Sequence, residues 1–319
     1  MVVGMPFKDI ATSDSIYLPK VPATSDAGAR KAIKRLQDVN VGVIAPIEEL
    51  QANPFPHSVA VVSLEAIVKN GGKLPALPEG SLRFAVKVTG IEPESSYDAL
   101  KSLQADANSK LAMLICEVPS SVSRVHASRR VFQMLSNIKS ELPVVHSLAF
   151  STSDAKDKDE LILRAGSEAG ALLVDGLGDG IMLSAAGFDL SLQRVTSFNL
   201  LQGSRMRSVK TDFVSCPSCG RTLFDLQEVT EQIKEKTGHL PGVAIAIMGC
   251  IVNGPGEMAD ADFGYVGGAP GKVDLYVGKE VVKRGIPNEK ACDALVELIK
   301  EYGRWQEKPE VEEKAMANA

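Results

Sequence analysis

The 319-residue sequence has no excess of positive charge and no long apolar run. Lys and Arg number 35 against 40 for Asp and Glu, so the net charge is -5. A broad nucleic-acid-binding surface is disfavoured, because such surfaces neutralise phosphates with clustered positive charge. No apolar stretch approaches the roughly 20 residues that span a bilayer, so no membrane span is expected. Residues 1–6 resemble neither a signal peptide nor an organellar transit peptide.

Cysteine is also scarce, and five residues in a chain of this length do not make a disulfide scaffold. Cys116 lies in an apolar segment and Cys292 on an amphipathic one, where cysteine packs as a small hydrophobic side chain. The other three, Cys216, Cys219 and Cys250, are close together in the sequence. This clustering is the most informative feature of the chain.

The sequence does contain enough apolar material for a sizeable core, with 45% hydrophobic and 24% charged residues. Between residues 27 and about 205, short apolar runs alternate with amphipathic stretches, which predicts an α/β domain with a parallel sheet. The pattern fits a doubly wound sheet or a (β/α) barrel with some elements missing, and periodicity does not separate the two. The predicted strands are 41–44, 59–62, 83–86, 111–116, 143–145 and 172–174, and the predicted helices include 95–103, 124–138 and 159–169.

The pattern changes near residue 208. The regular segments beyond it are helices over 225–236 and 288–302 and strands over 243–248 and 272–277. Two strands with glycine-rich turns between two helices indicate a small α+β domain. We therefore predict one domain over 1–208, a second over 209–305, and a flexible tail over 306–319.

The clustered cysteines occur in two short motifs. Cys216 and Cys219 form a C-x-x-C pair, whereas Cys250 starts a loop of Asn, Gly and Pro that ends at Glu257. Glycine and proline let such a loop fold back, which brings Glu257 toward Cys250. Three thiolates and one carboxylate are then available to one inorganic centre. Three interpretations stay open from the residues alone: reduced cysteines without a metal, a structural zinc site, or an iron–sulfur cluster with one non-cysteine ligand.

These motifs resemble those of a known family. Three segments resemble the C-terminal domain of the 4-hydroxy-3-methylbut-2-en-1-yl diphosphate synthases. These enzymes are iron–sulfur oxidoreductases of the non-mevalonate isoprenoid pathway. The segments are Cys-Pro-Ser-Cys-Gly-Arg at 216–221, Met-Gly-Cys-Ile-Val-Asn-Gly-Pro-Gly-Glu at 248–257 and Ala-Asp-Ala-Asp-Phe-Gly-Tyr-Val-Gly-Gly at 259–268. Residues 1 to about 205 resemble the insert domain of the plant-type, three-domain version. The resemblance implies a degenerate (β/α) barrel-like domain followed by a small α+β iron–sulfur domain. Met182 stands where the catalytic barrel usually has an arginine, which fits a supporting domain.

The resemblance also implies a site and a reaction. Cys216, Cys219, Cys250 and Glu257 would ligate a 4Fe-4S cluster, with Glu257 displaced by substrate. Asn253 would point its amide at the substrate oxygen near the unique iron. The reaction would open 2-C-methyl-D-erythritol 2,4-cyclodiphosphate reductively to 4-hydroxy-3-methylbut-2-enyl diphosphate and water. Ferredoxin would supply the electrons one at a time in the chloroplast stroma.

The resemblance does not extend to the first barrel, which in this family cradles the cyclic diphosphate. It therefore implies that Met1 is an internal residue of a longer protein. We expect the 319 residues alone to bind a cluster without appreciable turnover. The alternative from a different class is a non-catalytic zinc-binding α/β interaction module.

Overall fold

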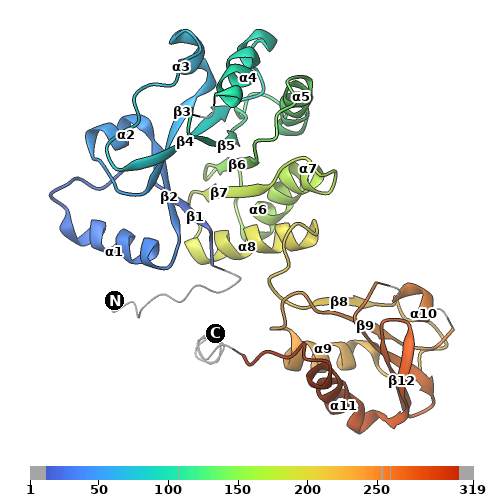
Figure 1. The fold of residues 1–319 in the computed structure, drawn as a ribbon. Helices are drawn as coiled ribbons and strands as arrows, with labels where there is room; N and C mark the ends of the chain where they lie inside the picture. The colour runs from blue at the N-terminus through green and yellow to red at the C-terminus, as the bar shows by residue number, and fades with distance from the viewer. Residues whose placement is uncertain (1–11, 107, 253, 259, 309–319) are drawn as a thin grey trace. The chain divides into compact units, whose positions relative to one another are not determined.

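The structure is a computed structural model that describes residues 12–308 except 107, 253 and 259. The chain divides into two compact units, Met1–Arg207 and Ser208–Ala319. Each unit has its own sheet and its own core (Figure 1). No helix in the described part of the chain is both long enough and apolar enough to cross a bilayer. Most of the predicted tail, from residue 309 onward, lies outside the described residues.

The first unit is built on one parallel sheet of seven described strands. The strands are β1 (Ser15–Tyr17), β2 (Gly42–Pro46), β3 (Ser58–Ser63), β4 (Ser81–Val88), β5 (Leu111–Cys116), β6 (Val144–Phe150) and β7 (Gly180–Ala185). Their order in the sheet is their order in the sequence, and every adjacent pair is parallel. Parallel neighbours need crossover connections, and helices supply them here. The predicted α/β class is confirmed.

Most helices of this unit begin at a capping side chain. The helices are α1 (Ala27–Asp38), α2 (Ile47–Ala52), α3 (Leu64–Lys69), α4 (Tyr97–Ala105), α5 (Arg124–Asn137), α6 (Lys158–Ala165), α7 (Ala171–Leu173) and α8 (Leu190–Gly203). A short 3-10 turn, η1 (Glu94–Ser96), precedes α4, and a π-helical turn, η2 (Gly166–Gly170), joins α6 to α7. The side chains that accept a hydrogen bond from the first helical turn are Asp26, Ser63, Ser123, Asp157 and Asp189. Each satisfies a backbone N–H that has no partner within its helix.

The seven-stranded sheet is rolled into a barrel-like form. Strands β2 to β5 contribute one buried side chain each to an inner cluster made of Ile44, Val61, Ala85 and Ile115. Tyr17 of β1 and Met182 of β7 both pack against this cluster. Both edge strands therefore contact the same interior. Consecutive strand order around an apolar interior, with helices outside, is the arrangement of a (β/α) barrel.

One predicted strand of this unit is wrong. Leu172 and Leu173 lie in α7, at the end of a helical run that continues from α6 through η2, and Val174 follows it. β6 pairs with β5 on one side and, on the other, with β7, a strand that the sequence pattern does not predict. Because Leu172 and Leu173 are buried, their apolar run was compatible with either a helix or a strand.

The second unit contains a five-stranded mixed sheet within the described residues. Its strands are β8 (Asp212–Ser215), β9 (Ala244–Met248), β10 (Phe263–Ala269), β11 (Lys272–Val277) and β12 (Glu280–Pro287), in the order β12-β11-β10-β9-β8. β8, β9 and β10 are parallel, whereas β11 and β12 are added as antiparallel hairpins. The two strands predicted from the sequence correspond to β9 and β11. The α+β character is as predicted, but the sheet is larger.

Both faces of this sheet are covered near its centre. Helices α9 (Leu226–Thr237) and α11 (Asn288–Glu301) contribute Ile233 and Leu295 to a core with β9, β10 and β11. The opposite face has a smaller cluster that includes Met248 and Met258. Met258 directly follows the one-turn helix α10 (Gly254–Glu257). Strand β9 is thus buried on both sides, which explains its uninterrupted apolar sequence.

Candidate functional site

Two adjacent parallel strands bring the cysteine motifs to the same end of the second sheet. Ser215 at the end of β8 lies opposite Ile247 near the end of β9. Cys216 follows β8 directly, whereas Gly249 and Cys250 follow β9. The backbone N–H of Cys216 donates to the carbonyl of Ile247 at 3.3 Å, which extends the pairing by one residue. The sheet register therefore places both motifs at one edge.

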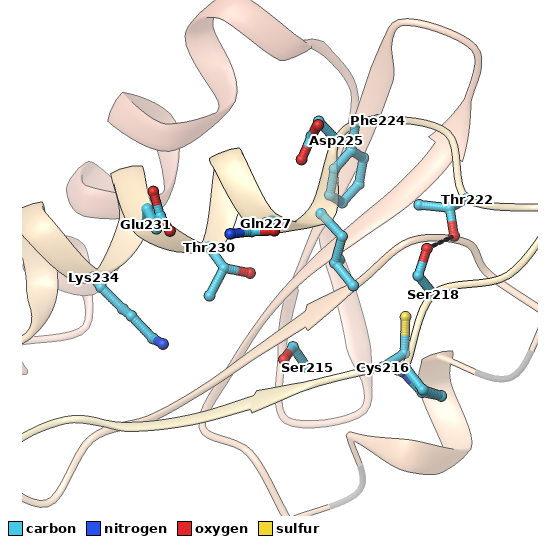
Figure 2. A pocket seen from close by; sticks show the side chains of 12 residues that line it. Ser215, Cys216, Ser218, Thr222, Phe224, Asp225, Gln227, Thr230, Glu231 and Lys234 are labelled. Carbon is cyan, nitrogen blue, oxygen red and sulfur yellow. Dashed lines mark hydrogen bonds between the residues drawn. The ribbon is translucent and has the colours of Figure 1, made fainter.

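The C-x-x-C segment forms a compact turn. Ser218 has a left-handed backbone conformation with φ of 65°. The backbone N–H of Cys219 donates to Thr222 Oγ1 at 3.0 Å, and the Thr222 N–H donates back to the Cys219 carbonyl at 3.0 Å. The hydroxyls of Ser218 and Thr222 are hydrogen-bonded at 3.2 Å (Figure 2). These bonds hold a turn that includes an unfavourable backbone conformation.

Hydrogen-bond donors point at two of the sulfur atoms. The backbone N–H of Gly249 donates to Cys216 Sγ at 3.3 Å. Hydrogen bonds from the Arg221 backbone N–H and then from its side chain lower the pKa of the exposed Cys219 thiol. Because the thiolate is the form that binds metal ions, the lowered pKa of Cys219 favours metal binding at that residue.

Strand β10 approaches the Cys250 segment closely. A Cβ atom placed on Gly267 would lie against the carbonyl oxygen of Gly249 and 3.1 Å from its carbonyl carbon. That carbonyl oxygen also accepts a hydrogen bond from the Leu223 N–H at 3.0 Å. Only glycine at 267 permits this backbone contact. The position of Gly249, and of the N–H that it donates to Cys216, therefore depends on β10.

The remaining predicted site residues are the fourth ligand, Glu257, in α10 and the substrate-contacting Asn253. Glu257 is exposed at the end of this helix, and the buried Met258 anchors the turn through an N–H bond to the Gly254 carbonyl at 2.9 Å. Asn253 lies outside the described residues.

The donor chemistry fits an iron–sulfur cluster, because Cys216, Cys219 and Cys250 are free and come from neighbouring strand ends. Their side chains are not assembled into a ligand set, since no three His, Cys, Asp or Glu residues of the described part converge as a metal site. Sequence reasoning placed these residues together, whereas their convergence on one centre stays a prediction.

A cavity of about 680 Å³ opens beside Cys216. Figure 2 shows Cys216 and Ser218 at one end of this cavity and Thr230, Glu231 and Lys234 of α9 toward the other. The lining is mostly polar and charged, with Phe224 and Leu226 among its apolar members, and it includes Cys216, Pro217 and Ser218 of the C-x-x-C turn. The cysteine turn is therefore accessible to a partner or to solvent.

The other cysteines and the nearest histidine are used in packing. Burial raises the pKa of the Cys116 thiol to about 11 and also raises that of Cys292, which keeps both protonated. His239 hydrogen-bonds through Nε2 to the Gln306 carbonyl at 2.8 Å, and its ring meets the Trp305 ring edge-on. This agrees with the prediction that Cys116 and Cys292 are small packed residues.

Polar side chains also meet at the strand ends of the barrel-like unit. Lys87 Nζ of β4 lies 3.1 Å from Glu117 Oε1, and Ser147 Oγ of β6 donates to Glu117 Oε2 at 3.2 Å. Burial and the nearby carboxylates of Glu117 and Glu48 raise the pKa of Tyr17 on β1. Lys87 and Ser147 thus both bind the Glu117 carboxylate.

Comparison with known proteins agrees with the motifs. Residues 212–301 match the family model described as GcpE protein C-terminal domain. The chain is 56% identical over 316 residues to the Arabidopsis thaliana protein named 4-hydroxy-3-methylbut-2-en-1-yl diphosphate synthase (ferredoxin), chloroplastic. The predicted resemblance to these synthases is confirmed. The synthase of the same name from Oryza sativa subsp. japonica is 56% identical over 312 residues, and the synthase (flavodoxin) of Protochlamydia amoebophila is 40% identical over 316 residues.

These matches cover the chain and its relatives unequally. They include 98%, 97% and 95% of this chain but 41%, 41% and 44% of the Arabidopsis, Oryza and Protochlamydia synthases. The chain therefore spans about two fifths of the length of the curated relatives it matches.

Sequence reasoning did not identify Thr222 or Gly267 as parts of the site. Thr222 lies three residues after Cys219, a spacing at which a hydroxyl accepts from a turn N–H. Gly267 and Gly268 interrupt an apolar strand, which is typical of a close backbone approach. Both features are visible in the sequence, but the sequence does not show which residue Thr222 or Gly267 contacts.

Proposed function

We propose that this chain is the cluster-binding part of a 4-hydroxy-3-methylbut-2-en-1-yl diphosphate synthase. The reaction is the reductive opening of 2-C-methyl-D-erythritol 2,4-cyclodiphosphate to 4-hydroxy-3-methylbut-2-enyl diphosphate. Two electrons enter, one ring carbon–oxygen bond to phosphate and one carbon–hydroxyl bond break, and a carbon–carbon double bond forms. Protons taken up from the surroundings convert the departing hydroxyl to water.

One structural observation supports this proposal above the others. The C-x-x-C turn and the Gly249–Cys250 segment follow adjacent parallel strands, and N–H donors are aimed at the sulfurs of Cys216 and Cys219. Buried structural cysteines such as Cys116 have the opposite environment. The similarity to the named synthases extends over both motifs.

In this proposal Cys216, Cys219 and Cys250 hold a 4Fe-4S cluster, and Glu257 is its exchangeable fourth ligand. The bound cluster supplies low-potential electrons and a Lewis-acidic iron for the departing oxygen. Glu257 is exposed and lies at the end of a single helical turn, so its carboxylate can move away without disturbing the core. The Asn253 amide donates a hydrogen bond to the substrate oxygen.

The barrel-like unit serves as a scaffold in this proposal. Its interior is apolar at Met182, and the ammonium of Lys87 is paired with Glu117. Binding a diphosphate requires several positively charged groups. Lys87, at the strand ends of this unit, already forms an ion pair with Glu117. We therefore assign diphosphate binding to another part of the complete enzyme. The Arabidopsis and Oryza relatives are named as ferredoxin-dependent and chloroplastic, which supports ferredoxin as electron donor and the chloroplast stroma as location.

The test is anaerobic reconstitution of the 319-residue chain with iron and sulfide, followed by iron, sulfide and zinc analysis. We expect a brown protein with iron and sulfide in equal amounts and no turnover of the cyclic diphosphate by this chain alone. Cys250→Ser should lose nearly all cluster, because a hydroxyl is a poor substitute for a thiolate ligand. Cys292→Ala is the matched control, since Cys292 is buried in the core, and it should keep the cluster.

Two results would contradict the proposal. A colourless protein with tightly bound zinc would support the zinc module instead. In the complete enzyme, an unchanged rate for Glu257→Ala would remove the carboxylate from the ligand set.

A further inference from the structure

Thr222 contacts the C-x-x-C turn with three hydrogen bonds. Its hydroxyl oxygen accepts from the Cys219 N–H at 3.0 Å and bonds the Ser218 hydroxyl at 3.2 Å. Its own N–H donates to the Cys219 carbonyl at 3.0 Å. Ser218, one residue before Cys219, has a φ of 65°, a left-handed backbone conformation that serine rarely adopts. The hydroxyl of Thr222 thus fixes the half of the turn that ends at Cys219.

The same side chain also touches the segment that leads to Cys250. A Cβ placed on Gly249 would lie 2.7 Å from Thr222 Cγ2 and 2.8 Å from Thr222 Oγ1, so the two residues are in direct contact. Gly249 is the residue whose N–H donates to Cys216 Sγ at 3.3 Å. It immediately precedes Cys250 in the sequence. Thr222 therefore lies between the two cysteine-bearing segments and touches both.

We propose that Thr222 is a positioning residue that fixes the separation of the two cysteine-bearing segments for cluster binding, an inference that rests on the proposed function. The hydroxyl accepts from the Cys219 N–H, and the same oxygen lies as close to Gly249 as the γ-methyl does, so a hydroxyl at this position reaches both segments. Substituting residues that orient ligands without touching the metal commonly costs about 10- to 100-fold in metal affinity. Hydrogen bonds to cluster sulfurs also set the reduction potential, so a displaced turn changes the potential.

Two substitutions separate the hydroxyl from the methyl group. Thr222→Val keeps the shape and the contact with Gly249 but removes the hydroxyl. Thr222→Ser keeps the hydroxyl and removes the methyl. Thr230→Val is the control, because Thr230 lines the same cavity from α9, away from the turn. All four proteins are reconstituted anaerobically as the full 319-residue chain, and circular dichroism of the apo forms checks that each is folded.

The readouts are cluster loss to an iron chelator, the midpoint potential, and the electron paramagnetic resonance spectrum of the reduced protein. We expect Thr222→Val to lose its cluster about 10-fold faster than the unsubstituted protein. Its potential should be more negative and its spectrum altered, because N–H groups near the sulfurs lose their alignment. Thr222→Ser should restore all three properties, and Thr230→Val should leave them unchanged.

The outcomes separate this inference from the proposed function. Brown wild-type protein with an indistinguishable Thr222→Val overturns the inference and leaves the proposed function intact. The inference is equally wrong if Thr222→Ser behaves like Thr222→Val, or if Thr230→Val is as labile as Thr222→Val. A colourless wild-type protein contradicts the proposed function itself, and the inference with it.

Discussion

The carboxyl ends of the parallel strands differ between the two units. In the barrel-like unit, Lys87 pairs with Glu117 there. In the second unit, the strand ends present free cysteines, and N–H groups donate to two of the sulfurs. A paired polar network is complete without a ligand, whereas donors around a thiolate stabilise a charge that a metal would balance.

This difference supports our proposal that the smaller unit holds the cluster. Both units place loops at strand ends, which is where α/β proteins usually bind ligands. The topology is therefore not what distinguishes them. What distinguishes them is whether the polar side chains at the strand ends form hydrogen bonds and ion pairs with one another.

The largest effect that tests this comparison is expected at Gly267. Gly267→Ala puts a methyl group against the carbonyl of Gly249, and a backbone group cannot turn aside as a side chain can. We expect the free energy of unfolding of the second unit to fall by about 1–3 kcal/mol, the usual cost of overpacking. Urea denaturation followed by Trp305 fluorescence measures it, because Trp305 is the single tryptophan and packs in this unit.

Gly220→Ala provides the control for this measurement. Gly220 lies inside the cysteine turn, but a Cβ placed there meets nothing within 4 Å. Its substitution should change stability little. Equal destabilisation by the two substitutions would mean that the close approach of β10 does not support the cysteine segment.

Much of the fold could be predicted from the sequence, and the failures have physical causes. Strands β2 to β5 were recognised because buried strands of a parallel sheet form continuous apolar runs. β1 has three residues, and β8 has four that are mostly exposed, so neither gives a pattern. β12 is an exposed edge strand with Lys283 and Arg284 in it, and such charges hide the strand signal.

The candidate site shows a similar division. The cysteines were found because their spacing is unusual, and spacing is visible in a sequence. Thr222 and Gly267 were missed because their importance depends on Gly249, which becomes their neighbour only when β8, β9 and β10 pair. Residues that position ligands across strands leave little trace in a one-dimensional pattern.

A second test uses the pH dependence of the barrel-like unit. Burial lowers the pKa of His146, whose Nε2 bonds the Leu177 carbonyl at 2.7 Å while its Nδ1 has no partner within the described residues. The folded state thus holds the neutral ring, and its stabilising effect is complete above the ordinary histidine pKa of about 6.5. As pH falls below that value, the unfolded chain takes up the proton and stability declines, by at most about 1.4 kcal/mol per pH unit.

Amide hydrogen exchange in β6, corrected for intrinsic rates, measures this decline between about pH 7.5 and about pH 5.5. Amide hydrogen exchange in β9 reports the second unit in the same samples and should respond less. His126→Gln, at an exposed position, should leave the dependence unchanged, and His146→Gln should reduce it. If the corrected exchange rate in β6 does not change with pH, His146 is not held neutral in the folded state.

The smallest effect is expected at the paired strand ends of the barrel-like unit. Lys87 and Glu117 are both 37% exposed, so water screens their attraction. We expect Lys87→Met to lower the free energy of unfolding by less than about 1 kcal/mol, with no change in cluster content. Chemical denaturation measures the first and iron analysis the second. The sharper measurement is turnover by the complete enzyme: if Lys87→Met abolishes it while the fold and the cluster persist, the barrel end binds a ligand, and the contrast between a self-paired unit and a chemically active one is wrong.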